Sequence, residues 1–378
     1  MTLSRTYLDW NATAPLRPQA RAAMVDAFDV VGNPSSVHAE GRAARRIIEN
    51  AREQVALLVG AAPRNVVFTS GATESNNWVH GRAWSVIVHS RLEHPSVLAM
   101  VDAAVHPAVA VTPDGTIDLD TLARVVREVG ASTDAKSGRA LLTLQAANNE
   151  TGVVQPLAEA VLLAKEQGLL IASDAVQVAG RLPLDFTASG IDYMTISAHK
   201  LGGPKGVGAV IVRENAPLDP LIIGGGQERR QRAGTENVAA IAGFGAAAER
   251  AAQDVASFAD LATLRDDLEH RMFEIVPDAI VIGAGAPRLP NTTCLAFPTR
   301  SSETLVAALD LAGIAVSAGA ACSSGKVAAS HVLEAMSLDP SVARGAIRVS
   351  LGMTTTENDI AAFLAAIADF TGRFAKAA

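Results

Sequence analysis

Apolar and polar positions along the first two-thirds of the chain follow two periods, one helical and one typical of buried strands. Residues 38–59 carry apolar side chains at helical spacing and end at Gly60, which predicts one helix. Short, almost wholly apolar runs follow, with helical patterns between several of them. These runs are residues 66–69, 86–88, 141–144, 169–172, 193–196 and 209–212. Because strands this apolar need cover on both faces, the pattern predicts a mostly parallel sheet between helices.

The pattern changes after about residue 236. A long helical stretch is predicted through residue 275, and shorter strands are predicted at residues 280–282, 294–297 and 347–350. The last helix is predicted to begin with a capping box of Thr354 and Glu357. Its buried stripe is expected to contain Ile360, Phe363, Leu364, Ile367 and Phe370. The fold class is therefore α/β, with a large sheet domain followed by a smaller α/β domain.

Composition narrows the function classes. The 378 residues are enough for two domains, and with 49% hydrophobic but only 4% aromatic residues the core is expected to consist of small and aliphatic side chains. The net charge of -7 without blocks of like charge argues against a nucleic-acid partner. The chain lacks the apolar core of a signal peptide, any membrane-length apolar run and any disulfide framework, so we expect a cytoplasmic protein without membrane contact. We find no His, Cys or carboxylate clusters with the spacing of metal ligands, so no bound metal is expected.

Lys200 and Cys322 are the residues whose surroundings carry the clearest chemical signal. Lys200 follows Ser197-Ala198-His199 and precedes a glycine-rich exit, as an imine-forming lysine would require, although most lysines are ordinary surface residues. Cys322 lies among small residues at 318–325, which indicates an exposed loop, with a small buried hydrophobe as the alternative. Cys294 lies in a strand pattern and is expected to be buried. Together, an imine-forming lysine and an accessible thiol indicate chemistry on a sulfur-bearing amino acid.

Polar clusters follow several predicted strands, where open α/β sheets bind their ligands. Residues 70–76 form either an anion cradle at a helix start or an ordinary helix whose N-cap is Thr73. Asp174 either pairs with a cationic ring nitrogen or caps the next helix. Residues 93–96 and 148–152 are further clusters of this kind. Each polar cluster alone is weak evidence for a ligand site. Ordinary solvated loops, however, do not readily explain why such clusters follow so many successive strands.

Ten segments match a known family in order and nearly from end to end. They are residues 7–13, 33–38, 69–77, 93–94, 149–152, 174–177, 197–200, 232–237, 318–325 and 347–353. With them the chain resembles the cysteine desulfurases of the nitrogenase-associated and iron–sulfur-assembly type, in the class V aminotransferase group of pyridoxal-phosphate (PLP) enzymes of fold type I. The resemblance implies a large PLP-binding domain at residues 16–252 with a mostly parallel, seven-stranded sheet. Residues 1–15 and 253–378 would form the small domain that carries the cysteine loop.

The resemblance also implies a role for each matching residue. Lys200 would bind PLP covalently and move the Cα proton of the substrate, His94 would stack on the pyridine ring, and Asp174 would pair with its nitrogen. Gln177 would hydrogen-bond the phenolic oxygen, with Asn149 near the same edge or the substrate. The implied phosphate ligands are Ala72, Thr73, Ser197 and His199, together with Thr235 of the partner subunit. Arg348 would bind the substrate carboxylate, assisted by Asn33.

The implied activity is conversion of L-cysteine to L-alanine, with the sulfur passing to the Cys322 thiolate as a persulfide for iron–sulfur cluster or other sulfur-compound biosynthesis. The implied partners are a second copy of the chain, in a homodimer, and a sulfur-acceptor or iron–sulfur scaffold protein. A selenocysteine lyase or another class V PLP enzyme, such as an aminotransferase or β-lyase, is the alternative. A non-catalytic scaffold is disfavoured because Lys200, Asp174, His94 and Cys322 are all present.

Overall fold

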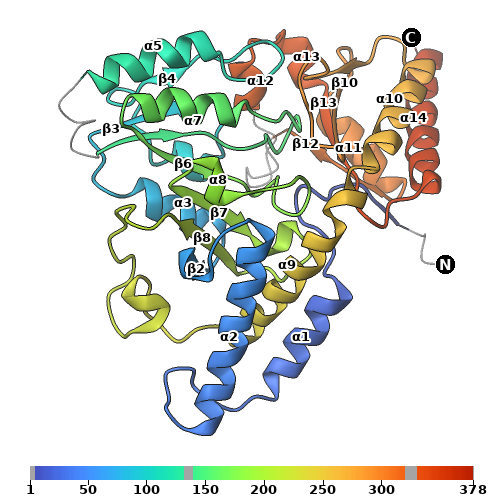
Figure 1. Cartoon of the computed structure of the whole chain (residues 1–378). Helices are drawn as coiled ribbons and strands as arrows, with labels where there is room; N and C mark the ends of the chain where they lie inside the picture. The colour runs from blue at the N-terminus through green and yellow to red at the C-terminus, as the bar shows by residue number, and fades with distance from the viewer. Residues whose placement is uncertain (1–4, 132–138, 320–329, 378) are drawn as a thin grey trace.

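A seven-stranded sheet forms the centre of the molecule (Figure 1). The computed structural model describes residues 5–131, 139–319 and 330–377. The strand order is β2-β8-β7-β6-β5-β3-β4; β8 pairs antiparallel with both β2 and β7, and the other pairs are parallel. The strands are β2 (Val66–Thr69), β3 (Val86–Ser90), β4 (Ala108–Val109), β5 (Ala140–Thr143), β6 (Leu170–Asp174), β7 (Tyr193–Ser197) and β8 (Gly208–Val212). The predicted mostly parallel sheet is confirmed, with β4 as an edge strand that the sequence pattern did not indicate.

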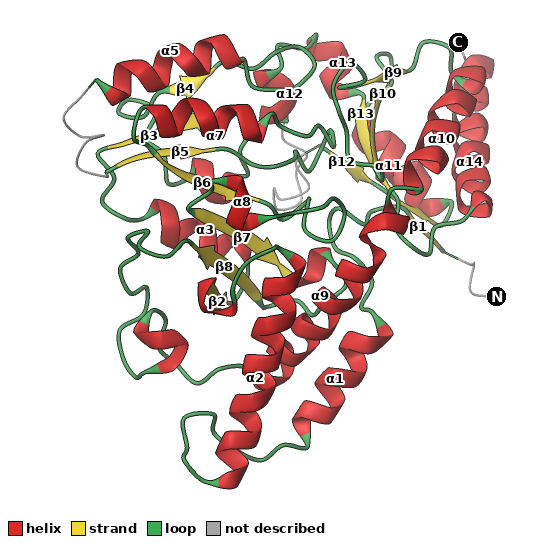
Figure 2. Ribbon diagram, in the orientation of Figure 1, coloured by secondary structure: helices red, strands yellow, loops and turns green. Residues whose placement is uncertain are grey.

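Alternate residues of the strands pack on the two faces of this sheet. Phe68 and Leu142 belong to a large core shared with α2 (Ala39–Leu58), α5 (Leu119–Gly130), α7 (Leu157–Glu166) and α9 (Val238–Phe258). Their neighbours Val67 and Leu141 belong to a second core on the other face, with Trp78 of α3 (Ala72–His80). The sheet is therefore covered on both sides, as its apolar strands require (Figure 2). Helix α1 (Pro18–Phe28) and helix α2 both pack against α9.

A smaller antiparallel sheet lies beside the first, with the order β12-β13-β10-β9. Its strands are β9 (Ile280–Val281), β10 (Thr292–Ala296), β12 (Ser317–Ala318) and β13 (Ala346–Ser350). It shares a separate core with α10 (Leu261–Ile275), α11 (Ser302–Leu311) and α14 (Glu357–Ala377). Leu8 joins this core, because β1 (Thr6–Tyr7) pairs with β11 (Ile314–Ala315). The remaining short helices are α4 (Pro95–Leu98), α8 (Phe186–Ser189), α12 (His331–Ala335) and α13 (Pro340–Arg344), with 3-10 turns η1 (Pro63–Asn65), η2 (Ala198–Lys200) and η3 (Gln227–Arg230).

Two local predictions need correction. The helical stretch expected up to residue 275 is two helices, since α9 ends at Phe258 and α10 begins at Leu261. The last helix is capped by Thr356 and Asp359 instead of Thr354 and Glu357: Thr356 Oγ1 donates to Asp359 Oδ2 over 2.8 Å, and Thr356 N–H donates to the same oxygen over 2.9 Å.

The division into domains at residues 15/16 and 252/253 stays a prediction. Helix α9 runs through the second of these positions, with Ala251 in the core of the large sheet and Phe258 in the core of the small one. Among the described residues no helix is both long and apolar enough to cross a bilayer. In the same residues no three metal-binding side chains gather.

Candidate active site

A cavity of about 670 Å³ lies between the large and small sheets, at the C-terminal ends of the parallel strands. It collects polar groups that follow β2, β3, β5, β6 and β7, and it takes Arg348 from β13. The predicted site residues that line it are Ala72, Thr73, His94, Asn149, Asp174, Gln177, Ser197, His199, Lys200 and Arg348. Asn33 and Thr235 are exposed and do not line it. Cys322 lies outside the described residues.

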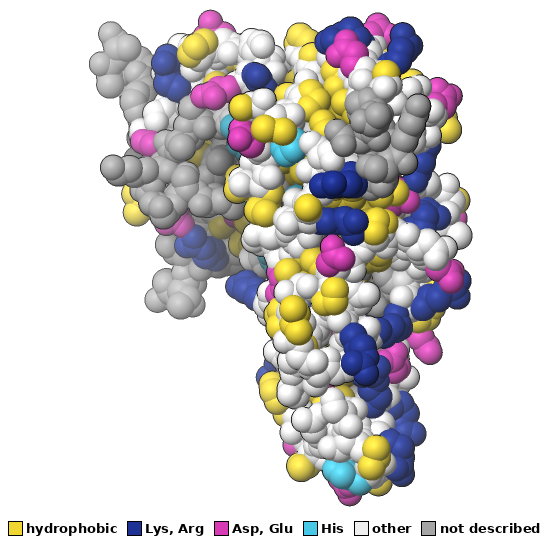
Figure 3. Space-filling view, turned by 90° about the vertical axis from the view of Figure 1, so that its left-hand side faces the viewer, with side chains coloured by type: hydrophobic (Ala, Val, Ile, Leu, Met, Phe, Trp, Pro, Cys, Tyr) yellow, Lys and Arg dark blue, Asp and Glu magenta, His cyan; other side chains and the backbone are white. Residues whose placement is uncertain are grey.

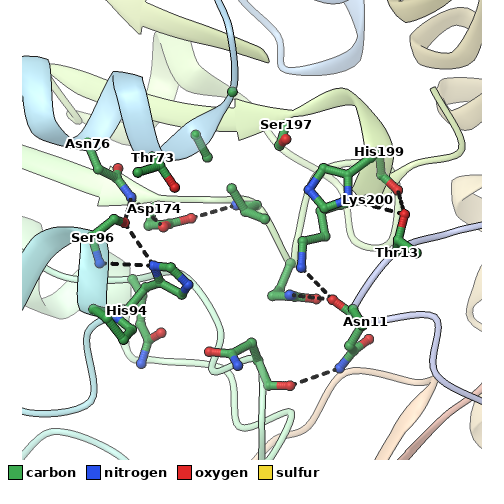
Figure 4. A pocket seen from close by; sticks show the side chains of 18 of the residues that line it. Asn11, Thr13, Thr73, Asn76, His94, Ser96, Asp174, Ser197, His199 and Lys200 are labelled. Atoms are coloured by element: carbon green, nitrogen blue, oxygen red, sulfur yellow. Dashed lines mark hydrogen bonds between the residues drawn. The ribbon is translucent and has the colours of Figure 1, made fainter. Parts of the chain in front are cut away.

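Lys200 enters the cavity from η2, directly after β7. Its Nζ donates a hydrogen bond to the carbonyl oxygen of Asn11 over 2.6 Å (Figure 4). The glycine-rich exit has a packing reason, because Gly202 has φ +87° and a Cβ there would lie 2.6 Å from Cγ of Arg17. Beside Lys200, burial lowers the pKa of His199 to about 4, with Lys200 and Lys205 acting in the same direction. The His199 ring is therefore neutral at physiological pH.

One end of the cavity is built to receive an anion. Helix α3 begins after Gly71, and no side chain caps this helix end. Its first N–H groups therefore remain available, and the helix dipole favours negative charge there. Ser197 and His199 line the same cavity. The alternative that Thr73 caps the helix is wrong, since Thr73 is its second residue.

Asp174 lies on the cavity wall with hydrogen bonds but no cation. Its Oδ2 accepts from Asn76 Nδ2 over 2.9 Å and its Oδ1 accepts from the N–H of Val176 over 3.0 Å. In the part of the chain that the structure describes, no Lys or Arg forms an ion pair with it. The N–H of Val176 opens a turn and not a helix, so the helix-cap alternative for Asp174 is wrong. A carboxylate placed in this way is suited to a cationic group on a ligand.

His94 faces Asp174 from the start of α4. Its Nδ1 accepts a hydrogen bond from the N–H of Ser96 over 3.1 Å. Burial lowers the pKa of His94, and the Asp174 carboxylate opposes this shift. The hydrogen bond from the N–H of Ser96 fixes the neutral His94 ring, which lines the cavity in one orientation. Figure 4 shows His94, Asp174 and Asn76 on one side of the cavity, opposite Lys200 and His199.

Arg348 supplies the cationic side of the cavity. Its Nη2 pairs with Asp9 Oδ1 at 2.6 Å and its Nη1 donates to the carbonyl oxygen of Asn149 over 2.9 Å. Nε is buried and has no hydrogen-bond partner among the described residues. A buried donor left open beside a cavity is suited to a ligand carboxylate.

Several lining residues were not predicted. Asn11 is fully buried and bonds both Lys200 and Asn149, and Asn76 holds Asp174. Glu150 and His331 lie at the cavity edge near the start of α12. Asn11 and Asn76 fall within segments that carry the resemblance, which was the one signal available for them.

The Aminotransferase class-V family model matches residues 6–363. The chain belongs to this family. It is 42% identical to a cysteine desulfurase of Cereibacter sphaeroides, over 95% of this chain and 93% of that protein. A solved NifS-like protein from Rickettsia africae superposes with a TM-score of 0.90 at 34% identity, covering 98% of this chain and all of that one. A structure described as SspA in complex with cysteine has a TM-score of 0.75 at 29% identity, covering 92% and 99% of the two chains.

This member of the class-V aminotransferase family is a PLP-dependent enzyme, and its cavity fits the cofactor. The open start of α3 suits the phosphate, the unpaired Asp174 carboxylate suits the protonated pyridine nitrogen, and the Lys200 amine suits the aldehyde. Gln177 and Asn149 line the cavity as well. Arg348, with its open Nε, is suited to a ligand carboxylate.

Proposed function

We propose that the chain is a cysteine desulfurase, which converts L-cysteine to L-alanine and transfers the sulfur atom to Cys322 as a persulfide. The proposal is supported by similarity to proteins of that name over almost the whole chain. The observation that carries it is the placement of the Lys200 amine, the Asp174 carboxylate and the Arg348 guanidinium around one cavity. The described residues on either side of the segment that contains Cys322 are Gly319 and Ser330, and both lie next to Glu150, which lines the same cavity.

Each lining residue has a task in this reaction. Bound PLP supplies an electron sink for the bonds at the substrate Cα. Arg348 holds the substrate carboxylate, which fixes the direction of the Cα–H bond. The Lys200 amine holds the cofactor at rest, then accepts the Cα proton and returns it. Asp174 would stabilise a proton on the pyridine nitrogen, and the neutral His94 ring would lie against the pyridine ring.

Sulfur transfer is assigned to Cys322. Its thiolate attacks the substrate sulfur, the bond between that sulfur and Cβ breaks, and Cβ takes up a proton to give L-alanine and the Cys322 persulfide. Gly319, the last described residue before the segment, lies beside Ser330, the first one after it. Ser330 Oγ donates to Glu150 Oε2 over 2.6 Å at the cavity edge.

The proposal includes a cytoplasmic homodimer that passes its sulfur to an acceptor or iron–sulfur scaffold protein. Thr235 of one protomer would complete the phosphate site of the other, which agrees with its exposed position away from its own cavity. Apolar side chains that a second copy could cover are exposed at the α1–α2 connection and nearby, and Figure 3 shows apolar groups among charged ones on that lobe. The exposed apolar side chains meant here are Phe28, Val31, Val37 and Ile223. The assignment of Asn33 to the substrate stays a prediction.

The test is incubation of the PLP-loaded protein with L-cysteine, with L-alanine measured and the persulfide located by mass spectrometry. We expect stoichiometric sulfur on Cys322 and none on Cys294. Cys322→Ala should abolish alanine formation and keep the yellow colour, whereas the matched control Cys294→Ala should retain both. Pyruvate in place of alanine would refute the assignment in favour of a β-lyase, and full alanine formation in Cys322→Ala would refute sulfur transfer to Cys322. Parallel assays with L-selenocysteine decide the remaining alternative.

A further inference from the structure

Arg181 is a buried cation next to Lys200, and the described residues offer it no carboxylate. Its side chain is 4% exposed. Nη1 donates to Oδ1 of Asn11 and, over 2.8 Å, to Oε1 of Gln177, and Nη2 lies 3.5 Å from the carbonyl oxygen of Lys200. All three acceptors are neutral. A buried charge without a counter-ion is costly, so its retention at this place indicates a function beyond packing.

The contacts of Arg181 decide how the Gln177 amide is turned. A guanidinium has donors only, so the amide atom that faces it must be the oxygen. Nε2 of Gln177 is therefore turned away from Arg181, and it donates to the carbonyl oxygen of Asn11 over 3.2 Å. Nε2 carries a second N–H, and Gln177 lines the cavity. Gln177 thus meets a ligand as a hydrogen-bond donor and not as an acceptor.

We propose that Arg181 is a positioning residue that acts through Gln177. By holding the amide oxygen, Arg181 keeps the Gln177 N–H directed at an anionic oxygen of the bound cofactor. A donor stabilises the anionic form of its acceptor. Without Arg181 the amide can rotate and offer its oxygen, which repels an anion. The inference rests on PLP binding in this cavity and does not depend on the sulfur-transfer step.

Charged groups from several elements face Arg181 and Gln177. Lys200 belongs to η2, Arg348 belongs to β13, and Asp9, which pairs with Arg348, follows β1. Further ionisable groups on the cavity or next to Arg181 are Asp174, His94, His199, Glu74, Glu150, Lys205, His331, Arg17 and Asp254. All of them are unchanged in the variants below, so differences between these variants arise from residues 177 and 181.

The test is a pH titration of the absorbance of bound PLP in four proteins: wild type, Arg181→Met, Gln177→Leu and the double variant. We expect Arg181→Met to raise the midpoint by about one pH unit when Gln177 is present. In the Gln177→Leu background the same substitution should produce less than half that shift. Arg181→Lys, which keeps a hydrogen-bond donor and the positive charge, should have a midpoint close to that of the wild type. Equal shifts in both backgrounds would mean that Arg181 acts by its charge alone and would overturn the proposal, as would no shift at all.

A second variant covers the case in which Arg181→Met does not fold. In Gln177→Glu the new carboxylate pairs with the intact Arg181 and leaves no N–H for the ligand, so the midpoint should rise at least as far as in Gln177→Leu. An unchanged midpoint would contradict the role of Gln177 as donor. These readouts need no L-cysteine. A wild-type protein that binds PLP without forming alanine would refute the desulfurase assignment and leave this test intact.

Discussion

Asn76 and Asp174 form a fixed pair on the cavity wall, with Nδ2 of Asn76 2.9 Å from Oδ2 of Asp174. The same amide donates to Ser96 Oγ, and its oxygen accepts from Thr195 Oγ1 over 2.7 Å. Because the Asn76 amide is anchored by these contacts from α4 and β7, the carboxylate is held in one orientation. In the proposed enzyme, Asp174 would then meet the ring nitrogen of PLP without reorganising.

Replacement of Asp174 by Asn should preserve the shape of the side chain and remove the charge that we propose stabilises the protonated ring nitrogen of PLP. We expect alanine formation to fall by at least about 100-fold while PLP remains bound. Asn76→Ala keeps the charge of Asp174 but removes a hydrogen bond that orients its carboxylate. The rate of alanine formation is therefore expected to fall about 10-fold. Initial rates and PLP absorbance of the purified variants check both values. Wild-type rates in Asp174→Asn would contradict the assigned role.

The Arg348 side chain predicts an effect on substrate affinity. Lysine in its place keeps the charge but cannot contact Asp9, the Asn149 carbonyl and a substrate carboxylate together. The KM for L-cysteine should therefore rise on the order of 10- to 100-fold in Arg348→Lys, with a smaller change in kcat. Arg288 is a matched control, since it is also largely buried and forms a two-bond ion pair, with Glu269, outside the cavity. An equal rise of KM in Arg288→Lys would point to a general loss of structure.

The burial of Cys294 predicts that its thiol does not react with alkylating reagents while the protein is folded. It is 3% exposed, and burial raises its pKa to about 12. At pH 8 only about one thiol in ten thousand is ionised, and alkylation requires the thiolate. In Cys322→Ala, where Cys294 is the single cysteine, iodoacetamide should label the protein only after denaturant is added. Mass spectrometry of the intact protein gives the answer, and rapid native labelling would contradict the buried position.

The elements that the sequence predicted well have a strong local pattern. The expected helix at residues 38–59 is α2, which spans Ala39–Leu58, and the strand at residues 66–69 is β2. The strands missed, such as β4 and β12, have two residues each and lie at sheet edges, where no period can appear. The capping box was misplaced by two residues because two Thr–acid pairs stand close together and only the fold selects between them.

The residues of the candidate site also divide into those that a local sequence pattern identifies and those that it does not. Side chains at strand ends could be expected to meet because parallel strands bring their C-terminal ends to one edge. The cavity confirms this for Asp174 and His94. Asn76 and Arg181 could not be identified in this way, because each acts through a neighbour that is distant or one turn away. In the sequence they are an amide inside a helical pattern and an arginine in a turn, residue types that usually lie on the surface, although both are buried here.

His80 predicts a loss of stability in acid. It is buried between the carbonyl oxygen of Asn76, 2.7 Å from Nδ1, and the hydroxyl of Thr143, 2.9 Å from Nε2. Burial lowers its pKa to about 4, whereas in the unfolded chain it titrates near its ordinary value of about 6.5. The unfolded state therefore binds the proton first as pH falls. Between pH 7.5 and pH 5 this linkage should remove about 2 kcal/mol of unfolding free energy.

Urea denaturation of the wild type and His80→Gln at both pH values isolates this contribution. The variant is expected to be less stable at pH 7.5, because glutamine cannot reproduce both contacts, but to lose less stability on acidification. His199, whose pKa is also lowered to about 4, remains in both proteins, so its contribution cancels in the comparison. His270→Gln, at an exposed position, should lose as much stability as the wild type. If His80→Gln also did so, the neutral state of buried His80 would not be a source of the acid sensitivity.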